Sequence, residues 1–493
     1  MKKTSLARLL AFLLVAITVV SSLVACGGKD KPTGEQGGGE WFITNHNEEN
    51  PNIQQKDYEG HEFTFICQPY LDGTGAYSVN YLVSDGETGN HILDAVYRRN
   101  SDLTRKYNVT FKQMQVKDLI TTVRSQVMGG GTEFDAIIGT AKDLATLARE
   151  NLLLDLNSVD RFDMTKSYWD GNAAKDLKIG EKLYFTNCDL NVQELAFVVY
   201  FNKALIANDE NLTSPYEYME NNEWTIDNWA NLVKSVSQDV NGDGEYTETD
   251  RYGTLYEYHN GRMFLYGSGV RVTTNDSTGK PVVTLFDTNK AVTVYEKCKD
   301  VFSSASSWCI NDMSGETHGY PDKWDYMRSL FCQDLYLFHY EGTNIIHQFA
   351  DMESEFGIVP FPKYNSEQTN YTSMYPLFCA MFAMPNTLEG EELARAADII
   401  EDMNYLSSLD LKQCWYDKLL KRRYTQDVES EANLEIIKNG RVYDVGLYYD
   451  FGGIRLKLVD LDVRNTNLNS TYKRLQRAIE ADIKSTYSKF DLS

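Results

Sequence analysis

Oxygen-bearing side chains recur at a fixed spacing over residues 239–250, where the chain reads DVNGDGEYTETD. Counted from the first residue, they fall at positions 1, 3, 5 and 12, and a glycine stands at position 6 (Asp239, Asn241, Asp243, Asp250 and Gly244). Oxygens at this spacing can surround a hard divalent cation, while the glycine allows a sharp turn. Glu245 at position 7 would add its backbone carbonyl oxygen. The pattern predicts a structural Ca²⁺ site.

The same loop has the ligand spacing of an EF-hand, with Asp250 where glutamate is usual. Dockerin-type loops resemble this version. The alternative is an Asx-rich surface turn, which would not need the glycine. Only one such loop is present, and only one helix clearly precedes it, so a calcium-driven opening of two helices is not indicated.

The first 26 residues have the features of an export signal. Three basic residues precede an apolar run from Leu9 to Val20, which as a helix would be about 18 Å long, shorter than the ~30 Å core of a bilayer. The next residues, LVACG, place small side chains before Cys26 and resemble the lipobox of bacterial lipoproteins. We expect a signal peptide at 1–25, a palmitate-type lipid anchor on Cys26 and a location on the extracellular face of the cell membrane. An ordinary signal peptide that contains a cysteine is the alternative.

Composition narrows the classes of function. The chain has 48 basic and 71 acidic residues, a net charge of −23, which argues against binding to nucleic acid or to an anionic membrane surface. Glycine-rich sequence after Cys26 predicts a flexible tether over 26–57. The seven later cysteines lack zinc spacing and are typical of buried thiols, with a Cys298–Cys309 bridge left open. Common nucleotide, zinc and serine-hydrolase motifs are missing.

Predicted strands alternate with predicted helices in the body of the chain. The apolar patterns place strands at 61–69, 109–114, 134–138, 183–185, 197–201 and 335–339, and helices at 92–107, 117–128, 141–150, 391–405 and 470–487. This alternation is typical of an α/β fold with parallel strands. Ligands of such sheets bind at the carboxyl ends of strands, which favours Tyr70, Asp72, Thr140 and Asp143 as neighbours of a site.

Four segments, taken in order, resemble one protein family: LYFTN…VVYFNK at 183–203, EWTIDNW at 223–229, FGIVPFP at 356–362 and MPN at 384–386. The chain is similar to the extracellular solute-binding proteins of ABC importers, in particular the carbohydrate-binding branch. The resemblance implies a two-lobed, type II-like periplasmic-binding-protein clamshell with hinge crossovers. Lobe 1 would comprise 58–190 plus about 360–410, and lobe 2 would comprise 195–355 plus about 411–493.

The resemblance also implies a function. A monomer would close over a small solute, an oligosaccharide or a sugar, and deliver it unchanged to the ABC permease subunits. Rings stack on the C–H faces of sugars, while polar side chains bond their hydroxyls. Candidate ligand-binding residues are Tyr70, Asp72, Thr140, Asn187, Asp189, Tyr256, Glu257, Tyr340, Glu341 and Tyr375. For each aromatic residue, packing in the core or on the surface is the alternative.

Two other functions stay open at this point. A secreted glycosidase would use two carboxylates, but no paired motif stands out among the 71 acidic residues. A calcium-dependent cell-surface binding module is suggested by the loop at 239–250, although a dockerin carries two such loops.

The loop gives the first prediction. Removal of Ca²⁺ with EDTA should lower the melting temperature of the chain and leave the solute site nearly unchanged, because the ion would hold only its own loop. Differential scanning calorimetry with and without EDTA measures the shift. An unchanged melting temperature would count against the ion.

Overall fold

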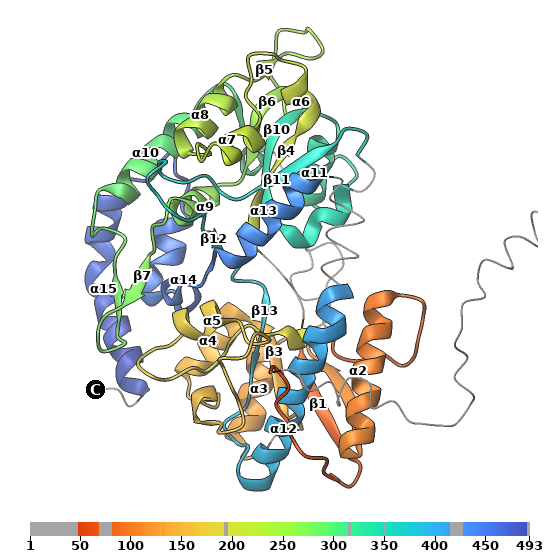
Figure 1. Cartoon of the computed structure of the whole chain (residues 1–493). Helices are drawn as coiled ribbons and strands as arrows, with labels where there is room; N and C mark the ends of the chain where they lie inside the picture. The colour runs from red at the N-terminus through yellow and green to blue at the C-terminus, as the bar shows by residue number, and fades with distance from the viewer. Residues whose placement is uncertain are drawn as a thin grey trace, which may run out of the picture. The chain divides into compact units, whose positions relative to one another are not determined.

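The computed structural model describes residues 48–68, 81–131, 133–191, 196–313, 317–349, 352–414 and 427–490. They lie within one compact unit, Phe42–Ser493, which contains two larger β-sheets flanked by helices (Figure 1). We call the two halves lobe 1 and lobe 2 after these sheets. The predicted lipid site Cys26 and the candidates Tyr70 and Asp72 lie outside the described residues.

Lobe 1 is built on a four-stranded sheet in the order β13-β3-β1-β2. The strands are β1 (His61–Cys67), β2 (Val109–Gln115), β3 (Ala136–Thr140) and β13 (Ala380–Ala383). β1 is parallel to β2 and β3, whereas β13 is antiparallel to β3. The helices of this half of the chain are α2 (His91–Tyr107), α3 (Leu119–Met128), α4 (Ala141–Arg149), α5 (Gly171–Asp176) and α12 (Gly390–Leu406). All five residues of β3 are buried, as expected for a strand covered on both faces.

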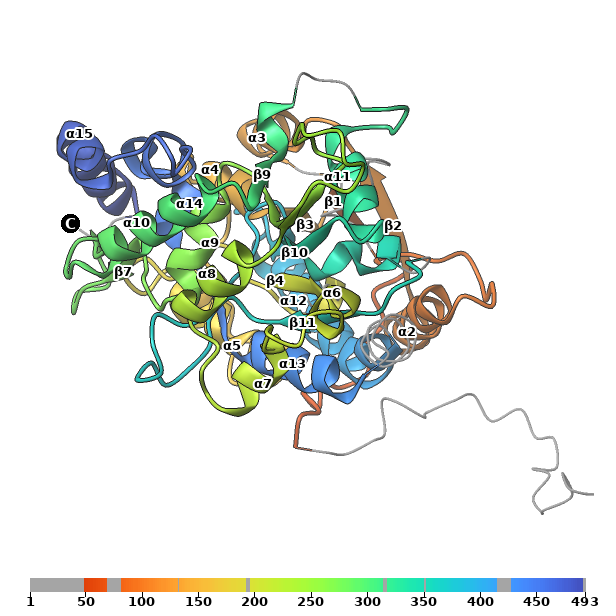
Figure 2. The same ribbon diagram turned by 90° about the horizontal axis from the view of Figure 1, so that it is seen from above.

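Lobe 2 is built on a six-stranded sheet in the order β11-β4-β10-β6-β5, with β9 also paired to β6. Its strands are β4 (Phe197–Asn202), β5 (Ser237–Gln238), β6 (Arg251–Tyr256), β9 (Ser307–Cys309), β10 (Tyr336–Gly342) and β11 (Phe356–Val359). Its helices include α6 (Lys203–Ala207), α7 (Pro215–Glu220), α8 (Ile226–Lys234), α9 (Asn260–Gly267), α10 (Lys290–Phe302), α11 (Lys323–Cys332) and α13 (Val428–Asn439). Figure 2 shows the whole chain from above, with the elements of lobe 2 in front of those of lobe 1.

The remaining elements complete the unit. Two small sheets pair β7 (Thr273–Asn275) with β8 (Pro281–Val283), and β12 (Ser373–Met374) with β14 (Arg441–Val442). α14 (Val445–Tyr449) and α15 (Leu468–Lys489) follow near the C-terminus.

Polar side chains cap the N-termini of α4 and α11, two helices at the candidate site. Thr140 ends β3, and its hydroxyl accepts a hydrogen bond from the Asp143 N–H, so it caps α4. Asp322 caps α11 in the same way through the N–H groups of Trp324 and Asp325. Such caps satisfy N–H groups that have no partner within the helix. They fix where each helix starts relative to the strand ends.

The chain passes between the sheets next to the carboxyl ends of strands. β4 is the first strand of lobe 2, and its first residue, Phe197, lies opposite Gly342, the last residue of β10. β13 is the first strand after the chain returns to lobe 1, and its Ala380 lies opposite Thr140, the last residue of β3. Both crossovers therefore border the edge at which parallel sheets bind ligands.

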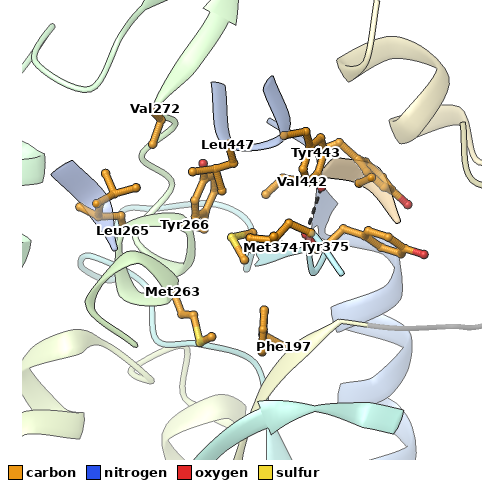
Figure 3. Packing of buried hydrophobic residues seen from close by; sticks show 14 of the residues in the cluster. Phe197, Met263, Leu265, Tyr266, Val272, Met374, Tyr375, Val442, Tyr443 and Leu447 are labelled. Carbon is orange, nitrogen blue, oxygen red and sulfur yellow. Dashed lines mark hydrogen bonds between the residues drawn. The ribbon is translucent and has the colours of Figure 1, made fainter. Parts of the chain in front are cut away.

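Apolar side chains from distant segments pack around these crossovers (Figure 3). Phe197 belongs to the same cluster as Tyr266 of α9, Met374 of β12, Val442 of β14 and Leu447 of α14. Tyr375 joins β14 through a backbone hydrogen bond from its N–H to the Val442 carbonyl oxygen, at 3.0 Å. One continuous core thus connects the crossovers with lobe 2.

Most predicted elements are present, with two corrections. Residues 183–185 form no strand. Leu183 and Phe185 are buried, but neither pairs with a described strand; the nearest pairings are isolated bridges from Lys182 to Ile179, from Thr186 to Phe382 and from Cys188 to Trp169. The prediction of a strand rests on the apolar residues of this segment alone, but no described strand pairs with the segment along its length.

The second correction concerns the predicted tether. Of the predicted range 26–57, residues 48–57 lie against the folded body. Ile53 is buried, and Lys56 pairs with the buried Asp398, which also accepts a hydrogen bond from the neighbouring Tyr58 hydroxyl. The glycine-rich part of the sequence ends well before residue 48. The apolar and aromatic residues of the later segment make contacts with the folded body that a flexible tether would not make.

The structure also describes the later cysteines and the length and apolar character of the helices. Cys298 and Cys309 are buried thiols, and no disulfide joins them. Within the described ranges, no helix combines the length and the apolar character needed to cross a bilayer.

Glu401 on α12 is a buried carboxyl that accepts hydrogen bonds from the Tyr168 hydroxyl, the Trp169 indole N–H and the Asp163 N–H. Burial raises its pKa to about 7, because these neutral donors only partly offset the loss of water. A raised pKa stabilises the folded state fully below pH 4.5, and this stabilisation is lost as the pH rises through 7.

We expect the free energy of unfolding of the wild type to fall, relative to Glu401→Gln, by on the order of 3 kcal/mol between pH 4.5 and pH 8. Urea denaturation at four pH values measures the difference. The control is Glu392→Gln, which changes an exposed glutamate of the same helix and should follow the wild-type profile. Parallel profiles for wild type and Glu401→Gln would contradict the assignment.

Candidate functional site

The carboxyl edge of the lobe 1 sheet carries Thr140 and Asp143, two of the residues favoured from the sequence. The Gln68 amide, just after β1, donates to Asp143 at 3.2 Å. Phe378 belongs to the crossover that leads into β13, and 38% of its surface is exposed. The Lys142 ammonium lies 5.3 Å from the centre of the Phe378 ring. This edge therefore has a partly exposed aromatic ring near the Gln68 amide and the buried Thr140 and Asp143 side chains.

The corresponding edge of lobe 2 carries Glu257, which follows β6. The Trp324 indole N–H donates to Glu257 at 2.5 Å, and the His259 Nε2 atom lies 3.2 Å from its other oxygen. Burial alone would raise the pKa of Glu257, but the charge and hydrogen bond of His259 and the bond from Trp324 outweigh it and lower the pKa to about 2. Glu257 is therefore an ionised acceptor.

Trp324 was not among the residues predicted from the sequence. Its ring is 39% exposed, and it lies at the start of α11. Because α11 precedes β10 and packs on it, the start of the helix lies at the carboxyl end of the strand. The local signal was available, since Asp322 two residues earlier is a typical helix cap, but the helix start alone does not place the ring beside Glu257.

Glu341, a predicted candidate, is a buried member of an ion-pair cluster rather than an open acceptor. Its carboxylate accepts from the Arg328 guanidinium, with Nε at 3.0 Å, and lies 3.0 Å from the His339 Nε2 atom. Burial works against ionisation, yet the Arg328 charge and these hydrogen bonds hold the pKa of Glu341 below its usual value.

The predicted tyrosines are core residues in this structure, in line with the packing alternative. Tyr256 stacks on Phe302 with ring centres 4.0 Å apart. The Tyr340 hydroxyl accepts hydrogen bonds from Trp229 and Thr254, both at 2.8 Å. Tyr375 is fully buried beside Tyr443. None of the three exposes more than 2% of its surface, so these rings have no free face for a ligand.

Asn187 and Asp189, predicted from the first crossover, lie in a polar pocket of about 290 Å³. The lining residues come from lobe 1, from the segment after α12 and from the α13–β14 turn: Ser167, Trp169, Asp170, Gly171, Asn172, Asn187, Cys188, Asp189, Lys412, Lys438, Asn439 and Arg441. We call this the polar pocket. Trp169 is only 2% exposed, so the pocket offers no open aromatic face.

Ion pairs join the walls of the polar pocket. The Arg441 guanidinium lies 2.8 Å from Asp170, which also accepts from the Tyr443 hydroxyl at 2.7 Å. Burial opposes ionisation of Asp170, but Arg441 and these hydrogen bonds keep its pKa below the usual value. Lys412 contacts both oxygens of Asp189 at 2.9 Å. The carboxylates of the pocket are thus already engaged by cations.

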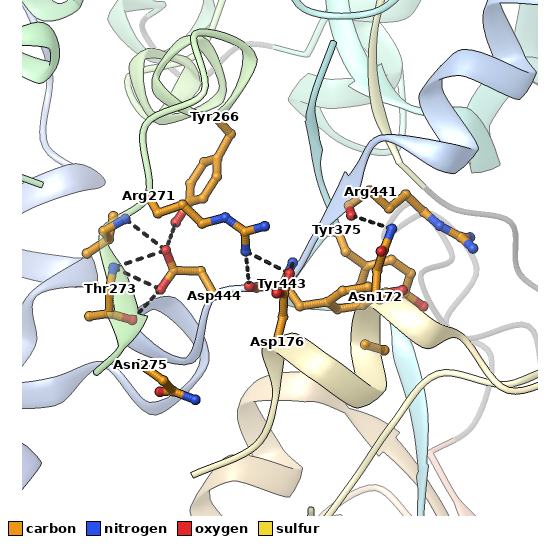
Figure 4. A network of polar contacts seen from close by, with 12 residues as sticks. Asn172, Asp176, Tyr266, Arg271, Thr273, Asn275, Tyr375, Arg441, Tyr443 and Asp444 are labelled. Atoms are coloured by element: carbon orange, nitrogen blue, oxygen red, sulfur yellow. Dashed lines mark hydrogen bonds and ion pairs between the residues drawn. The ribbon is translucent and has the colours of Figure 1, made fainter. Parts of the chain in front are cut away.

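A second network continues from the pocket into lobe 2 (Figure 4). Arg271 pairs with Asp176 at 2.7 Å and donates to the Tyr443 carbonyl oxygen at 2.8 Å. The buried Asp444 accepts from the Tyr266 hydroxyl and from the N–H of Val272, both at 2.8 Å. These bonds fix β14 between the lobes.

Comparison with known proteins identifies the fold. No family model matches the chain, and no curated protein matches its sequence. Solved structures do match: a sugar transporter from Rhizobium etli in an open conformation has a TM-score of 0.54 at 15% identity, over 85% of this chain and 99% of that one. The fold is that of the ABC solute-binding proteins.

Two further structures with this fold were solved with a ligand. A cyclo/maltodextrin-binding protein complexed with maltotetraose has a TM-score of 0.53 at 13% identity, over 88% of this chain and 98% of that one. An ABC substrate-binding protein from Listeria monocytogenes in complex with cycloalternan has a TM-score of 0.52 at 13% identity, over 87% and 99%. The predicted two-lobed α/β fold is confirmed.

The loop at 239–250 turns as its glycines require. Gly242 and Gly244 have φ angles of +73° and +82°, and Asp239 accepts from both of their N–H groups. Asp250 is buried, and its two oxygens accept from the N–H of Val240 and of Thr247. The donor set is all oxygen, as Ca²⁺ prefers. Among the described residues, however, no group of three or more His, Cys, Asp or Glu is arranged to hold a metal, and Ca²⁺ stays a prediction.

The Arg441–Asp170 pair yields a prediction. Arg441→Gln should lower the free energy of unfolding by about 3 kcal/mol, because it leaves a buried carboxylate without its cation. The double variant Asp170→Asn/Arg441→Gln should lose less than the sum of the two single variants. Urea denaturation of all four proteins at pH 7 measures this coupling, and additive losses would show that the pair does not act as a unit.

Proposed function

We propose that this chain is a lipid-anchored extracellular solute-binding protein that delivers an oligosaccharide or sugar to the permease of an ABC importer by closing its two lobes. One observation carries the proposal. The crossovers border the carboxyl edges of both sheets, and each edge presents a partly exposed ring with polar groups beside it. The rings are Phe378 in lobe 1 and Trp324 in lobe 2.

The chemistry of these edges suits a sugar. A pyranose has C–H faces that pack on aromatic rings and hydroxyls that need hydrogen-bond partners. Trp324 offers the ring, and the ionised Glu257 beside it offers an acceptor. On lobe 1, Phe378 has Thr140 and Asp143 nearby, at the end of β3 and in the first turn of α4. The polar pocket lacks an open ring, which favours the edges as the solute site.

The carboxyl groups at the edges favour binding over hydrolysis. A glycosidase needs one carboxylic acid that stays protonated near neutral pH. Glu257 has a pKa of about 2, and Glu341 is held ionised by Arg328. Glu401 has a pKa of about 7, but it is buried between Tyr168 and Trp169. These groups do not supply the acid that hydrolysis requires.

The remaining parts of the proposal rest on the sequence. A lipid on Cys26 would anchor the chain outside the cell membrane, and residues 27–47 would tether the body. Structural Ca²⁺ would be held by Asp239, Asn241, Asp243, the Glu245 carbonyl and Asp250. Permease subunits would receive the solute from the closed form. The protein would act as a monomer.

The proposal predicts the effect of removing a ring. Trp324→Ala should weaken binding of an oligosaccharide about tenfold, because the loss of stacking costs about 1.4 kcal/mol. Isothermal titration calorimetry against a panel of neutral and acidic oligosaccharides measures the affinity, and chromatography of the same mixtures detects products. The matched control is Tyr97→Ala, which removes an exposed ring of α2. Cleavage of the oligosaccharide, or equal affinities for wild type and Trp324→Ala, would contradict the proposal.

A further inference from the structure

Two of the exposed aromatic residues differ from the others because a lysine lies over the ring. Among the described residues, five aromatic side chains count as exposed: Tyr97, Tyr246, Tyr320, Trp324 and Phe378. Ring–cation contacts place a lysine over two of them. The Lys323 ammonium lies 4.9 Å from the ring centre of Trp324, and the Lys142 ammonium lies 5.3 Å from that of Phe378. These two rings are also the two at the carboxyl edges of the sheets.

Each edge therefore carries the same pair of groups, an open ring and an ammonium about 5 Å from its centre. In lobe 2, the Glu257 carboxylate lies 3.2 Å from the His259 Nε2 atom, and the charge of Lys323 also contributes to lowering its pKa. The next carboxylate, Asp325, pairs with Arg328 at 2.7 Å. In lobe 1, Lys142 lies 3.9 Å from Asp143, at the outer limit of an ion pair. Among the described residues, neither lysine forms an ion pair with a carboxylate closer than 3.9 Å.

The pairing discriminates between neutral and acidic sugars. An ammonium over an exposed ring is attracted to that face of the ring. A neutral pyranose that stacks on the same face must displace the ammonium and gives it no charged partner in return. A pyranose with a carboxylate or sulfate stacks its C–H face and pairs its anion with the displaced ammonium, and hydrogen bonds between charged groups are stronger than those between neutral groups.

We propose that the solute is an anionic oligosaccharide, with acidic sugar units held by Trp324 and Lys323 on lobe 2 and by Phe378 and Lys142 on lobe 1. The inference rests on the proposed function and specifies its solute class. The chain as a whole has a net charge of −23 and repels anions at a distance. The two lysines at the edges supply the local attraction that an acidic solute needs.

The test compares acidic sugars with neutral ones and includes a matched pair, a free acid and its methyl ester. Isothermal titration calorimetry of the mature full-length chain uses an oligogalacturonate, its methyl ester, a sulfated chondroitin oligosaccharide and a maltooligosaccharide. We expect the oligogalacturonate, the sulfated chondroitin oligosaccharide or both to bind more tightly than the maltooligosaccharide. The methyl ester should bind at least tenfold more weakly than the free acid.

Substitutions of the two lysines test whether they cause the preference for acidic sugars. Lys323→Gln and Lys142→Gln should each weaken binding of the acidic sugar about tenfold, whereas Lys323→Arg and Lys142→Arg should retain most of it. The matched control is Lys297→Gln, which removes a lysine near the ring of Tyr364, at 5.9 Å, and should bind like the wild type. Melting temperatures confirm that each variant is folded.

Failure of this inference is distinguishable from failure of the proposed function. If the methyl ester or the maltooligosaccharide binds as tightly as the acids, and the glutamine variants bind like the wild type, the charge preference is overturned while sugar binding stands. If none of the four sugars binds the folded wild type, the proposed function and the inference fall together.

Discussion

The rest of the structure depends on where the chain crosses between its two sheets. β4 and β13 each begin beside the last residue of a neighbouring strand, Gly342 of β10 and Thr140 of β3. Both strands must therefore run antiparallel to that neighbour. As a consequence, the carboxyl edges of both sheets border the same crossovers, and the loops that follow the parallel strands gather there. Hinge closure would bring such edges together around a solute.

The helices and strands that could be predicted are those that form because of residues close together in the sequence. β3 is a short apolar run buried at every position, and Thr140 caps α4 through its own hydroxyl. Contacts between side chains that lie far apart in the sequence could not be predicted. Asp189 pairs with Lys412, 223 residues later, and Trp324 meets Glu257 only because α11 packs against β10. Tyr256 and Tyr340 were candidates by type and position, but a sequence pattern does not tell whether a tyrosine ring at a strand end points into the core.

Three buried carboxylates of the described residues lie beside basic side chains. Asp170, Glu257 and Glu341 each have a basic partner, namely Arg441, His259 and Arg328, and the pKa of each is lowered. Glu401 has only neutral donors, and its pKa is raised. The ionised Glu257 at the edge of lobe 2 accepts hydrogen bonds, which suits the proposed binding of a polyhydroxylated solute. Rings with ammonium groups beside them supply the apolar and cationic parts of the same surface.

Hydrogen–deuterium exchange with and without a saturating oligosaccharide tests most directly whether the solute lies between the two carboxyl edges. The account predicts slower exchange in both lobes at once, at 140–144 and 376–380 in lobe 1 and at 257–260 and 323–327 in lobe 2. Protection confined to the polar pocket, at 168–172 and 438–441, would contradict it, as would protection of one lobe alone.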